Sequence, residues 1–331
     1  NFNNYLQRIG DFYSGQIYYG FDGYLAEYNF IDGQALTADD FGEFDDNGTW
    51  KPLEYEGTYG NNGFYLPMTP TTEATGFNTV LYAGDGGTQS INGVGFSPDL
   101  VWIKSRDYAY SHALFDSVRG ASKWLTSNST QAESTQTGLT SFDSDGFTLG
   151  SNTGQNDGSK TFVAWCWDAG SGSAGTNTDG DINSTVKANT TSGFSIVSYT
   201  GTGSATTVGH GLSSAPEMVI FKNRDGAYDW ATYHKDLTSA AYTVYLSLTY
   251  AQSTNSTVAK YYNSTDPTST VFSIGASNNY TNLSSNKYIA YCFNSVAGYS
   301  KFGSYTGNGS AGKSVTGLGF QPAWLMIKCS S

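Results

Sequence analysis

The 331-residue chain carries few charges and is rich in aromatic residues. Charged residues make up 13% of it, against about a quarter in a typical soluble domain, while aromatic residues reach 15% and glycine occurs 40 times. The net charge of −12 argues against nucleic acid as a partner, and no apolar run approaches the roughly 18 residues that a membrane span requires. The composition therefore predicts neither nucleic-acid binding nor membrane insertion. It favours antiparallel sheets made of aromatic and β-branched residues between Gly, Asn, Asp and Ser turns.

The region before residue 70 differs from everything that follows. Within residues 20–33 apolar and polar side chains alternate, as in a half-buried strand, and the acidic stretch 39–46 comes next. Neither segment has a counterpart later in the chain. We therefore expect a separate domain here, of which this stretch is the end.

The rest of the sequence contains two complete copies of one module and the first part of a third copy. Each copy has a Tyr-x-Gly segment and then a proline that is followed, six residues later, by a lysine preceded by four apolar residues. The first two copies continue with an Arg-Asp pair, a Phe-x-Leu/Ile-Gly segment and a closing Ala-aromatic-Cys-aromatic segment. The runs from proline to lysine are residues 98–104, 216–222 and 322–328.

Two apolar runs of the first copy predict how its strands pack. Residues 100–103 and 162–167 are apolar at consecutive positions, so both faces of these strands are expected to be covered. In the second run, Val163, Trp165 and Trp167 share one face, and Ala164 and Cys166 share the other. Two sheets packed face to face satisfy this pattern. The sequence thus predicts an all-β, elongated chain of tandem β-sandwich or jelly-roll-like domains.

Several segments resemble a known family. Residues 21–27 (FDGYLAE), 30–36 (FIDGQAL) and 59–66 resemble the last strands of a concanavalin/laminin-G-like sandwich common in marine bacteriophage tail and fibre proteins. The repeated module, with Gly-Phe-Ser/Gln-Pro, the run ending in Lys and Ala-Trp-Cys-Trp-Asp, is similar to the tandem uncharacterised β-domains downstream in the same phage proteins. The calcium and sugar ligands of legume lectins have no matching motif here.

This resemblance implies a structural component of a virion, such as a tail fibre, spike or head-surface appendage, located outside the cell. It implies no catalytic, cofactor-binding or metal-binding residues, and it leaves the ligand-binding residues unassigned. The expected partners are other virion proteins, further copies of the chain (fibres are often homotrimers) and a glycan or protein of the host surface, bound by multivalent loops. Two alternatives remain open: a cellular extracellular adhesin or filament module, and a polysaccharide depolymerase with two convergent carboxylates.

Together these observations divide the chain into five segments. We expect the end of a concanavalin/laminin-G-like sandwich at 1–68, a first repeat domain at 69–170, a Gly/Ser linker at 171–184, a second repeat domain at 185–298 and the start of a truncated third one at 299–331. Because the third copy stops just past Lys328 and the first domain starts near its end, we expect a longer polypeptide.

The cysteines and histidines do not form a recognisable site. Cys166 and Cys292 occupy the same place in two copies and are expected to be free, buried cysteines rather than a disulfide. Cys329 belongs to neither position. The histidines have no partner at metal-ligand spacing, so we expect no zinc site; they are His112, His210 and His234.

The remaining candidates have structural explanations. Residues 177–183 contain closely spaced oxygen ligands for Ca²⁺, but they lack the glycine and glutamate of an EF-hand and favour a solvated linker. The recurring lysines (Lys104, Lys222 and Lys328) are predicted to snorkel at strand ends, and the Arg-Asp pairs (residues 106–107 and 224–225) to fix a turn by an Arg–Asp hydrogen bond. Ligand contact is the alternative for both. The segments that differ most between copies, 106–141 and 224–269, are where contacts with a partner are expected.

Overall fold

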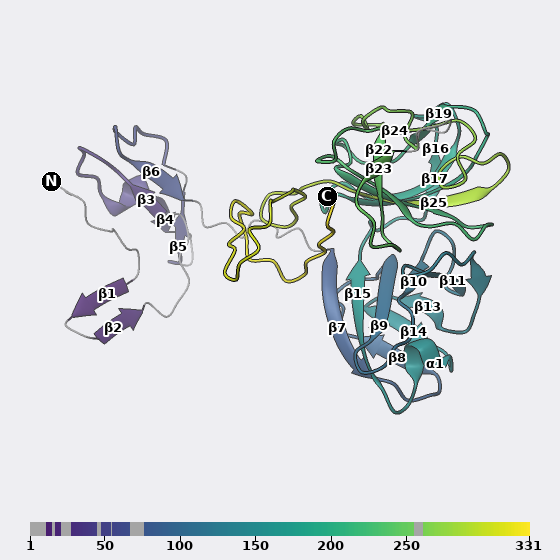
Figure 1. The fold of residues 1–331 in the computed structure, drawn as a ribbon. Helices are drawn as coiled ribbons and strands as arrows, with labels where there is room; N and C mark the ends of the chain where they lie inside the picture. The colour runs from purple at the N-terminus through teal and green to yellow at the C-terminus, as the bar shows by residue number, and fades with distance from the viewer. Residues whose placement is uncertain are drawn as a thin grey trace. The chain divides into compact units, whose positions relative to one another are not determined.

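The computed structural model describes residues 11–14, 17–20, 28–44, 48–53, 55–66, 76–254 and 261–331. The chain divides into two compact units, residues 1–72 (the N-terminal unit) and residues 73–331 (the repeat unit). Both are built from antiparallel strands (Figure 1), which confirms the predicted all-β, sandwich-type fold. Helical structure in the described ranges is confined to the 3-10 turn η1 (Ala38–Asp40) and the one-turn helix α1 (Thr153–Asn156). No helix within these ranges is long and apolar enough to cross a membrane.

The described residues of the N-terminal unit form three two-stranded sheets. Phe30 stacks on Phe64 at 5.5 Å, and the backbone N–H of Asp32 donates to the carbonyl of Tyr59 at 2.9 Å. These contacts join two of the segments that carry the lectin-like resemblance, whereas residues 21–27 lie outside the described residues. The strand pairs are β1 (Asp11–Ser14) with β2 (Ile17–Gly20), β3 (Tyr28–Phe30) with β6 (Phe64–Leu66), and β4 (Gly42–Phe44) with β5 (Trp50–Pro52).

The first copy forms a six-stranded sheet facing a three-stranded one. The large sheet has the order β12-β11-β10-β9-β15-β7, and the small sheet has the order β13-β14-β8. The strands are β7 (Phe77–Ala83), β8 (Gln89–Asn92), β9 (Leu100–Ser105), β10 (Ala113–Asp116), β11 (Lys123–Thr126), β12 (Ser134–Thr135), β13 (Leu139–Asp143), β14 (Gly146–Leu149) and β15 (Thr161–Trp167).

The second copy repeats this plan with a larger main sheet. Its eight-stranded sheet has the order β16-β17-β18-β25-β20-β21-β22-β23, and β19 pairs with β24 in a second sheet. The strands are β16 (Gly175–Asn177), β17 (Ser184–Asn189), β18 (Phe194–Thr200), β19 (Thr206–Gly209), β20 (Met218–Asn223), β21 (Ala231–His234), β22 (Tyr242–Tyr245), β23 (Ser253–Thr254), β24 (Val271–Ile274) and β25 (Lys287–Phe293).

The described residues of the repeat unit form four layers with three cores between them. Each copy buries one face of its main sheet against its own small sheet, and the opposite faces of the two main sheets pack on each other. Strand β9 shows the alternation: Val101 and Ile103 lie inside the first copy, whereas Leu100 and Trp102 face the second copy. The prediction that both faces are covered is correct. The second covering layer is the other copy.

The segment expected to be an unpacked linker is largely structured. Residues 175–177 form the edge strand β16, Ile182 bridges Val208, and β17 begins at Ser184. The linker prediction for 171–184 is therefore wrong for its second half. Gly and Ser are compatible with an edge strand where the neighbouring strand β17 supplies the backbone partners.

The third copy forms no strand in residues 301–331. In the first two copies, the strand that ends in Tyr-x-Gly and the proline-led strand are not neighbours, because the closing strand lies between them (β7-β15-β9 and β18-β25-β20). The printed sequence of the third copy contains the two outer segments without a closing segment.

Candidate functional site

The contact between the two copies contains a buried charged cluster. Arg119 follows β10, and its side chain is fully buried against the equally buried carboxylate of Asp116, with Glu133 at 3.2 Å. Arg224, just after β20 of the second copy, donates two hydrogen bonds of 2.9 Å to the carboxylate of Glu133. The hydroxyl of Tyr291, on β25, donates to Asp116 at 2.7 Å. Two guanidinium groups and two carboxylates from both copies thus neutralise one another.

Two members of this cluster, Glu133 and Arg119, are held in their ionised forms. Burial raises the pKa of Glu133, but hydrogen bonds from Arg224 and the positive charge of both arginines outweigh burial and lower it overall. Burial likewise opposes the charge of Arg119, and the neighbouring carboxylate of Asp116 more than compensates. With every charge paired, the cluster is suited to holding the copies together. The sequence analysis missed it because Arg119 and Glu133 belong to no repeated motif.

An open cavity is lined by residues of both main sheets and of the C-terminal segment. Its volume is about 1550 Å³, and residues 298–307 and 320–331 form much of its wall. Apolar side chains from both sheets line it, among them Trp102, Leu114, Ile220 and Phe293. The cavity therefore suits contact with apolar or aromatic groups.

Aromatic side chains gather at one edge of this cavity. Trp167 of β15 lies 4.9 Å from Phe77 and 6.4 Å from Trp102, measured between ring centroids. Trp324, in the third copy, meets Trp167 edge-on at 5.5 Å and also contacts Trp165. This contact fastens the C-terminal segment to the first copy.

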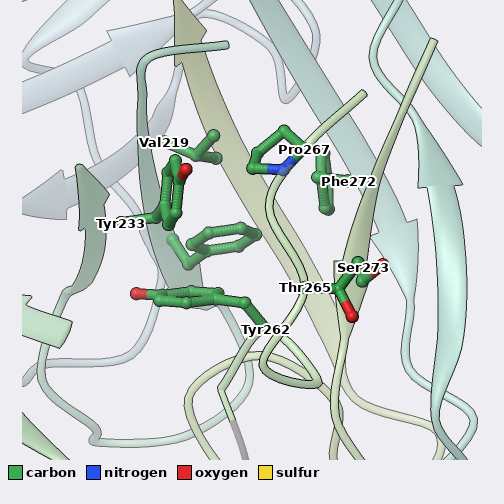
Figure 2. A pocket seen from close by; sticks show the side chains of 8 residues that line it. Val219, Tyr233, Tyr262, Thr265, Pro267, Phe272 and Ser273 are labelled. Carbon is green, nitrogen blue, oxygen red and sulfur yellow. The ribbon is translucent and has the colours of Figure 1, made fainter. Parts of the chain in front are cut away.

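A second depression, in the core of the second copy, is too small to be a site. It is lined by rings from β20, β21 and the loop before β24 (Figure 2) and has no space for a water molecule. Tyr262 stacks on Phe221 at 5.4 Å, and the Tyr233 hydroxyl donates to Asp266 at 2.9 Å. The rings fill the space themselves.

Two of the recurring lysines cap the turn that follows the proline-led strand, whereas Lys328 donates to the carbonyl of Tyr250 at 2.7 Å. The ammonium of Lys104 donates to the carbonyls of Ser105 (2.6 Å) and Tyr108 (2.8 Å). Lys222 is fully buried and donates to Tyr228 (2.7 Å), Gly226 and, in the first copy, Thr130 (3.0 Å). The prediction of a snorkelling side chain is thus wrong for Lys222. Its head group is bound by backbone carbonyls rather than by water.

Burial lowers the pKa of Lys222 into a pH range in which its effect on stability can be measured. It lowers the pKa from 10.5 to about 8, so between about pH 8 and 10 the folded chain binds fewer protons than the unfolded chain. The contribution of this group to stability therefore rises with pH in that window. We expect the difference in unfolding free energy between the wild type and Lys222→Met to grow by about 2 kcal/mol from about pH 7 to pH 9.5. Urea denaturation of both proteins at each pH measures it.

Other groups lower the stability as the pH rises, and subtracting the unfolding free energy of the variant from that of the wild type cancels their contributions. Cys166 and Cys292, whose pKa burial raises to about 12, lower stability in alkaline solution in both proteins alike. A difference that stays constant with pH would contradict the assignment to Lys222.

The Arg-Asp pairs do not bond internally, which corrects the sequence prediction. Instead, each aspartate fixes the turn to the start of the closing strand: the Asp107 carboxylate accepts from the N–H of Thr161 at 3.2 Å, and that of Asp225 from the N–H of Lys287 at 2.7 Å. Arg224 points away to Glu133 in the other copy. Both pairs lie in the bend that follows the proline-led strand, and in the second pair the two side chains serve different partners.

The other candidate residues also have structural partners. His112 accepts a hydrogen bond from the Trp102 indole at 3.2 Å, His210 lies 3.1 Å from the carbonyl of Thr268, and burial lowers the pKa of all three histidines. Cys166 and Cys292 are free and buried, as expected, and Cys329 is exposed. Over the ranges that the structure describes, no three His, Cys, Asp or Glu residues gather as metal ligands.

The oxygen-rich segment 177–183 is occupied by internal hydrogen bonds. The Asp181 carboxylate accepts from the backbone N–H and the hydroxyl of Thr207, and the Asn177 side chain accepts from the N–H of Asp179. These bonds attach the segment to β19. Most residues of the segment are exposed, as expected of a solvated stretch, but the segment is attached to the sheet rather than free.

Contacts with a partner are expected in the variable segments 106–141 and 224–269. Parts of both segments form strands of the main sheets. Residues 106–141 supply β10, β11, β12 and Glu133, and residues 224–269 supply β21, β22 and β23. Among the described residues of these segments, two large hydrophobic side chains are exposed: Tyr108 at 52% and Tyr250 at 65%.

Fold and site together define a repeat-built, all-β protein whose two sandwiches share a buried interface. Residues 73–331, most of the chain, match the model of a family described as a domain of unknown function (DUF7483), and the chain belongs to that family. No curated protein and no solved structure matches the chain.

Proposed function

We propose that this chain is a structural attachment module of an extracellular appendage, specifically of a bacteriophage virion. One observation carries the proposal: the two copies share a buried apolar core and a charged cluster, so that they form one body without a flexible joint. Such a body suits a spacer that holds contact loops at a fixed distance from a particle. The resemblance of the motifs to phage tail and fibre proteins supports the same assignment.

Contact with the host is proposed for the exposed loop tyrosines. Tyr108 and Tyr250 stand in the loops after β9 and β22 and present apolar rings with a polar hydroxyl. One such contact is weak. Many copies on one particle, assembled with each other and with further virion proteins, would bind a host glycan or protein through avidity.

Mass spectrometry of purified phage particles tests the structural part of this proposal. We expect peptides of the chain in the particles. Their presence on cell envelopes and absence from particles would favour a cellular adhesin instead. Release of reducing ends from surface polysaccharide by the purified protein would indicate a depolymerase.

Binding of protein-coated beads to host cells tests the attachment part. The double variant Tyr108→Ala/Tyr250→Ala is expected to lower bead retention at least about tenfold, because avidity multiplies small losses at each contact. Val315→Ala, which removes an exposed side chain outside these loops, is the matched control. Equal retention of all three proteins would refute a role for the tyrosines.

A further inference from the structure

A lysine of the second copy meets a buried aspartate of the first copy. The ammonium of Lys187, on β17, lies 2.6 Å from a carboxylate oxygen of Asp99, and the two side chains are 16% and 2% exposed. Asp99 directly precedes β9, so the pair joins residues that are 88 positions apart in the sequence. This ion pair is a further polar link between the copies, besides the charged cluster around Arg119.

Both the backbone and the carboxylate of Asp99 are fixed by hydrogen bonds. Its N–H donates to the carbonyl of Trp167 at 2.7 Å, and its carbonyl accepts from the N–H of Ser117 at 2.8 Å. Oδ1 accepts from the Ser117 hydroxyl at 2.5 Å and from Lys187, whereas Oδ2 accepts from the N–H of Ala169 at 2.9 Å. The carboxyl group therefore cannot turn away from the lysine without losing these bonds.

Lys187 likewise projects from a strand that is held in a sheet. Residues 185–189 of β17 pair with β18, and Lys187 stands opposite Ile196. The amine nitrogen and the carboxyl group are thus kept at contact distance by the fold. Reactive groups that are fixed in this way reach effective concentrations of about 10⁵–10⁸ M, which favours their condensation over hydrolysis by water.

The surroundings of Asp99 favour the neutral carboxyl group, which is the form that an amine can attack. Burial raises the pKa of Asp99, and this effect exceeds the opposite effect of the hydrogen bonds from Lys187 and Ser117. Transfer of a proton from the ammonium to the carboxylate gives a neutral amine and a neutral carboxyl group. In that state the amine nitrogen is the nucleophile and the carboxyl carbon is its electrophile.

We propose that Lys187 and Asp99 condense to an isopeptide bond that crosslinks the two copies. The Nζ atom of Lys187 attacks Cγ of Asp99, so that a C–N bond forms as the C–Oδ1 bond breaks. Oδ1 leaves as water with two of the three ammonium protons, and the third proton stays on the amide nitrogen. Oδ2 remains as the amide oxygen, and the N–H of Ala169 stabilises the charge that it carries during the attack. This inference does not depend on the assignment to a virion.

The second copy supplies an internal control at the equivalent position. Glu217 takes the place of Asp99, directly after the proline, and its carboxylate lies 3.0 Å from the ammonium of Lys235. These side chains are 25% and 33% exposed, so water reaches both groups. Burial raises the pKa of Glu217, but hydrogen bonds from Ser295 and Lys235 outweigh burial and lower it overall. The carboxylate of Glu217 therefore stays ionised, and we expect no bond between it and Lys235.

Mass spectrometry of the purified full chain tests the proposal. We expect an intact mass lower than that of the sequence by one water molecule and, after protease digestion, a branched peptide that joins Asp99 to Lys187. Lys187→Arg keeps the positive charge, but its guanidinium is always protonated and does not attack, so this variant should keep the full mass. Lys235→Arg is the matched control and should lose one water molecule like the wild type.

Three results would overturn the proposal. A wild-type mass equal to that of the sequence, after incubation at neutral pH, would show that the pair stays ionic. A loss of water that persists in Lys187→Arg would indicate a succinimide at Asp157 or another aspartate that precedes a glycine. A branched peptide that contains Lys235 would place the reaction in the other pair. The branched peptide of the wild type decides the matter even if a variant fails to fold.

Discussion

Replacing Arg119 by alanine is expected to lower the unfolding free energy of the repeat unit by about 3–5 kcal/mol. The guanidinium is fully buried and balances the buried carboxylate of Asp116, so its removal leaves an uncompensated charge between the two copies. Glu133 keeps its pair with Arg224, but Asp116 retains only two uncharged donors, the hydroxyl of Tyr291 and the backbone N–H of residue 119. Urea denaturation followed by tryptophan fluorescence measures the loss.

Lys235→Ala is the matched control, because it breaks an ion pair of similar length outside the interface. Lys235 lies 3.0 Å from Glu217, and both side chains are partly exposed. Such pairs contribute about 1 kcal/mol or less. If the two substitutions cost the same, the cluster around Arg119 is not the buried, mutually dependent network that its geometry indicates.

The sequence predicts where the strands of the repeat unit lie better than it predicts which elements pack against them. Consecutive apolar positions in residues 162–167 correctly indicate a strand covered on both faces, with Ala164 and Cys166 on one side and Trp165 and Trp167 on the other. The pattern reports burial and not the identity of the covering layer. That the second copy covers the tryptophan face follows only from the way the sheets stack.

The partners of long-range polar contacts cannot be predicted from the sequence either, because a motif shows which residues recur and not what they contact. Arg224 stands beside Asp225, which suggests a local bond, yet its carboxylate partner is Glu133, 91 residues earlier. Lys222 follows an apolar run, which suggests snorkelling, yet its acceptors are backbone carbonyls that any residue type supplies. A repeat thus reveals which positions matter without revealing their partners.

The third copy shows how a correct motif can lead to a wrong local structure. The apolar run at 324–327 matches two strands of the complete copies, and the match predicts a strand. A strand depends on backbone hydrogen bonds to a neighbouring strand, and residues 324–327 pair with none in the structure. Propensity alone does not replace such bonds.

Trp230→Ala is expected to destabilise the repeat unit by about 3–5 kcal/mol, the usual cost of removing a fully buried large aromatic side chain. Trp230 precedes β21 of the second copy and is 0% exposed. Its indole N–H donates to the carbonyl of Thr126, in β11 of the first copy, at 2.8 Å. The substitution opens a cavity in the shared core and leaves that carbonyl without its partner. Denaturation curves of the variant and the wild type give the difference.

The repeat supplies a matched control at the same position of the other copy. His112 occupies the place of Trp230 in the first copy, where it is half-buried and accepts a hydrogen bond from Trp102. His112→Ala should cost about 1–2 kcal/mol, since it removes one hydrogen bond and little buried area. Equal losses would mean that the two copies use this position alike and that Trp230 does not join them. A larger loss for Trp230→Ala would show that the contact between the two copies contributes strongly to the stability of the repeat unit. The hydrogen bond and the packing that this substitution removes both cross that contact.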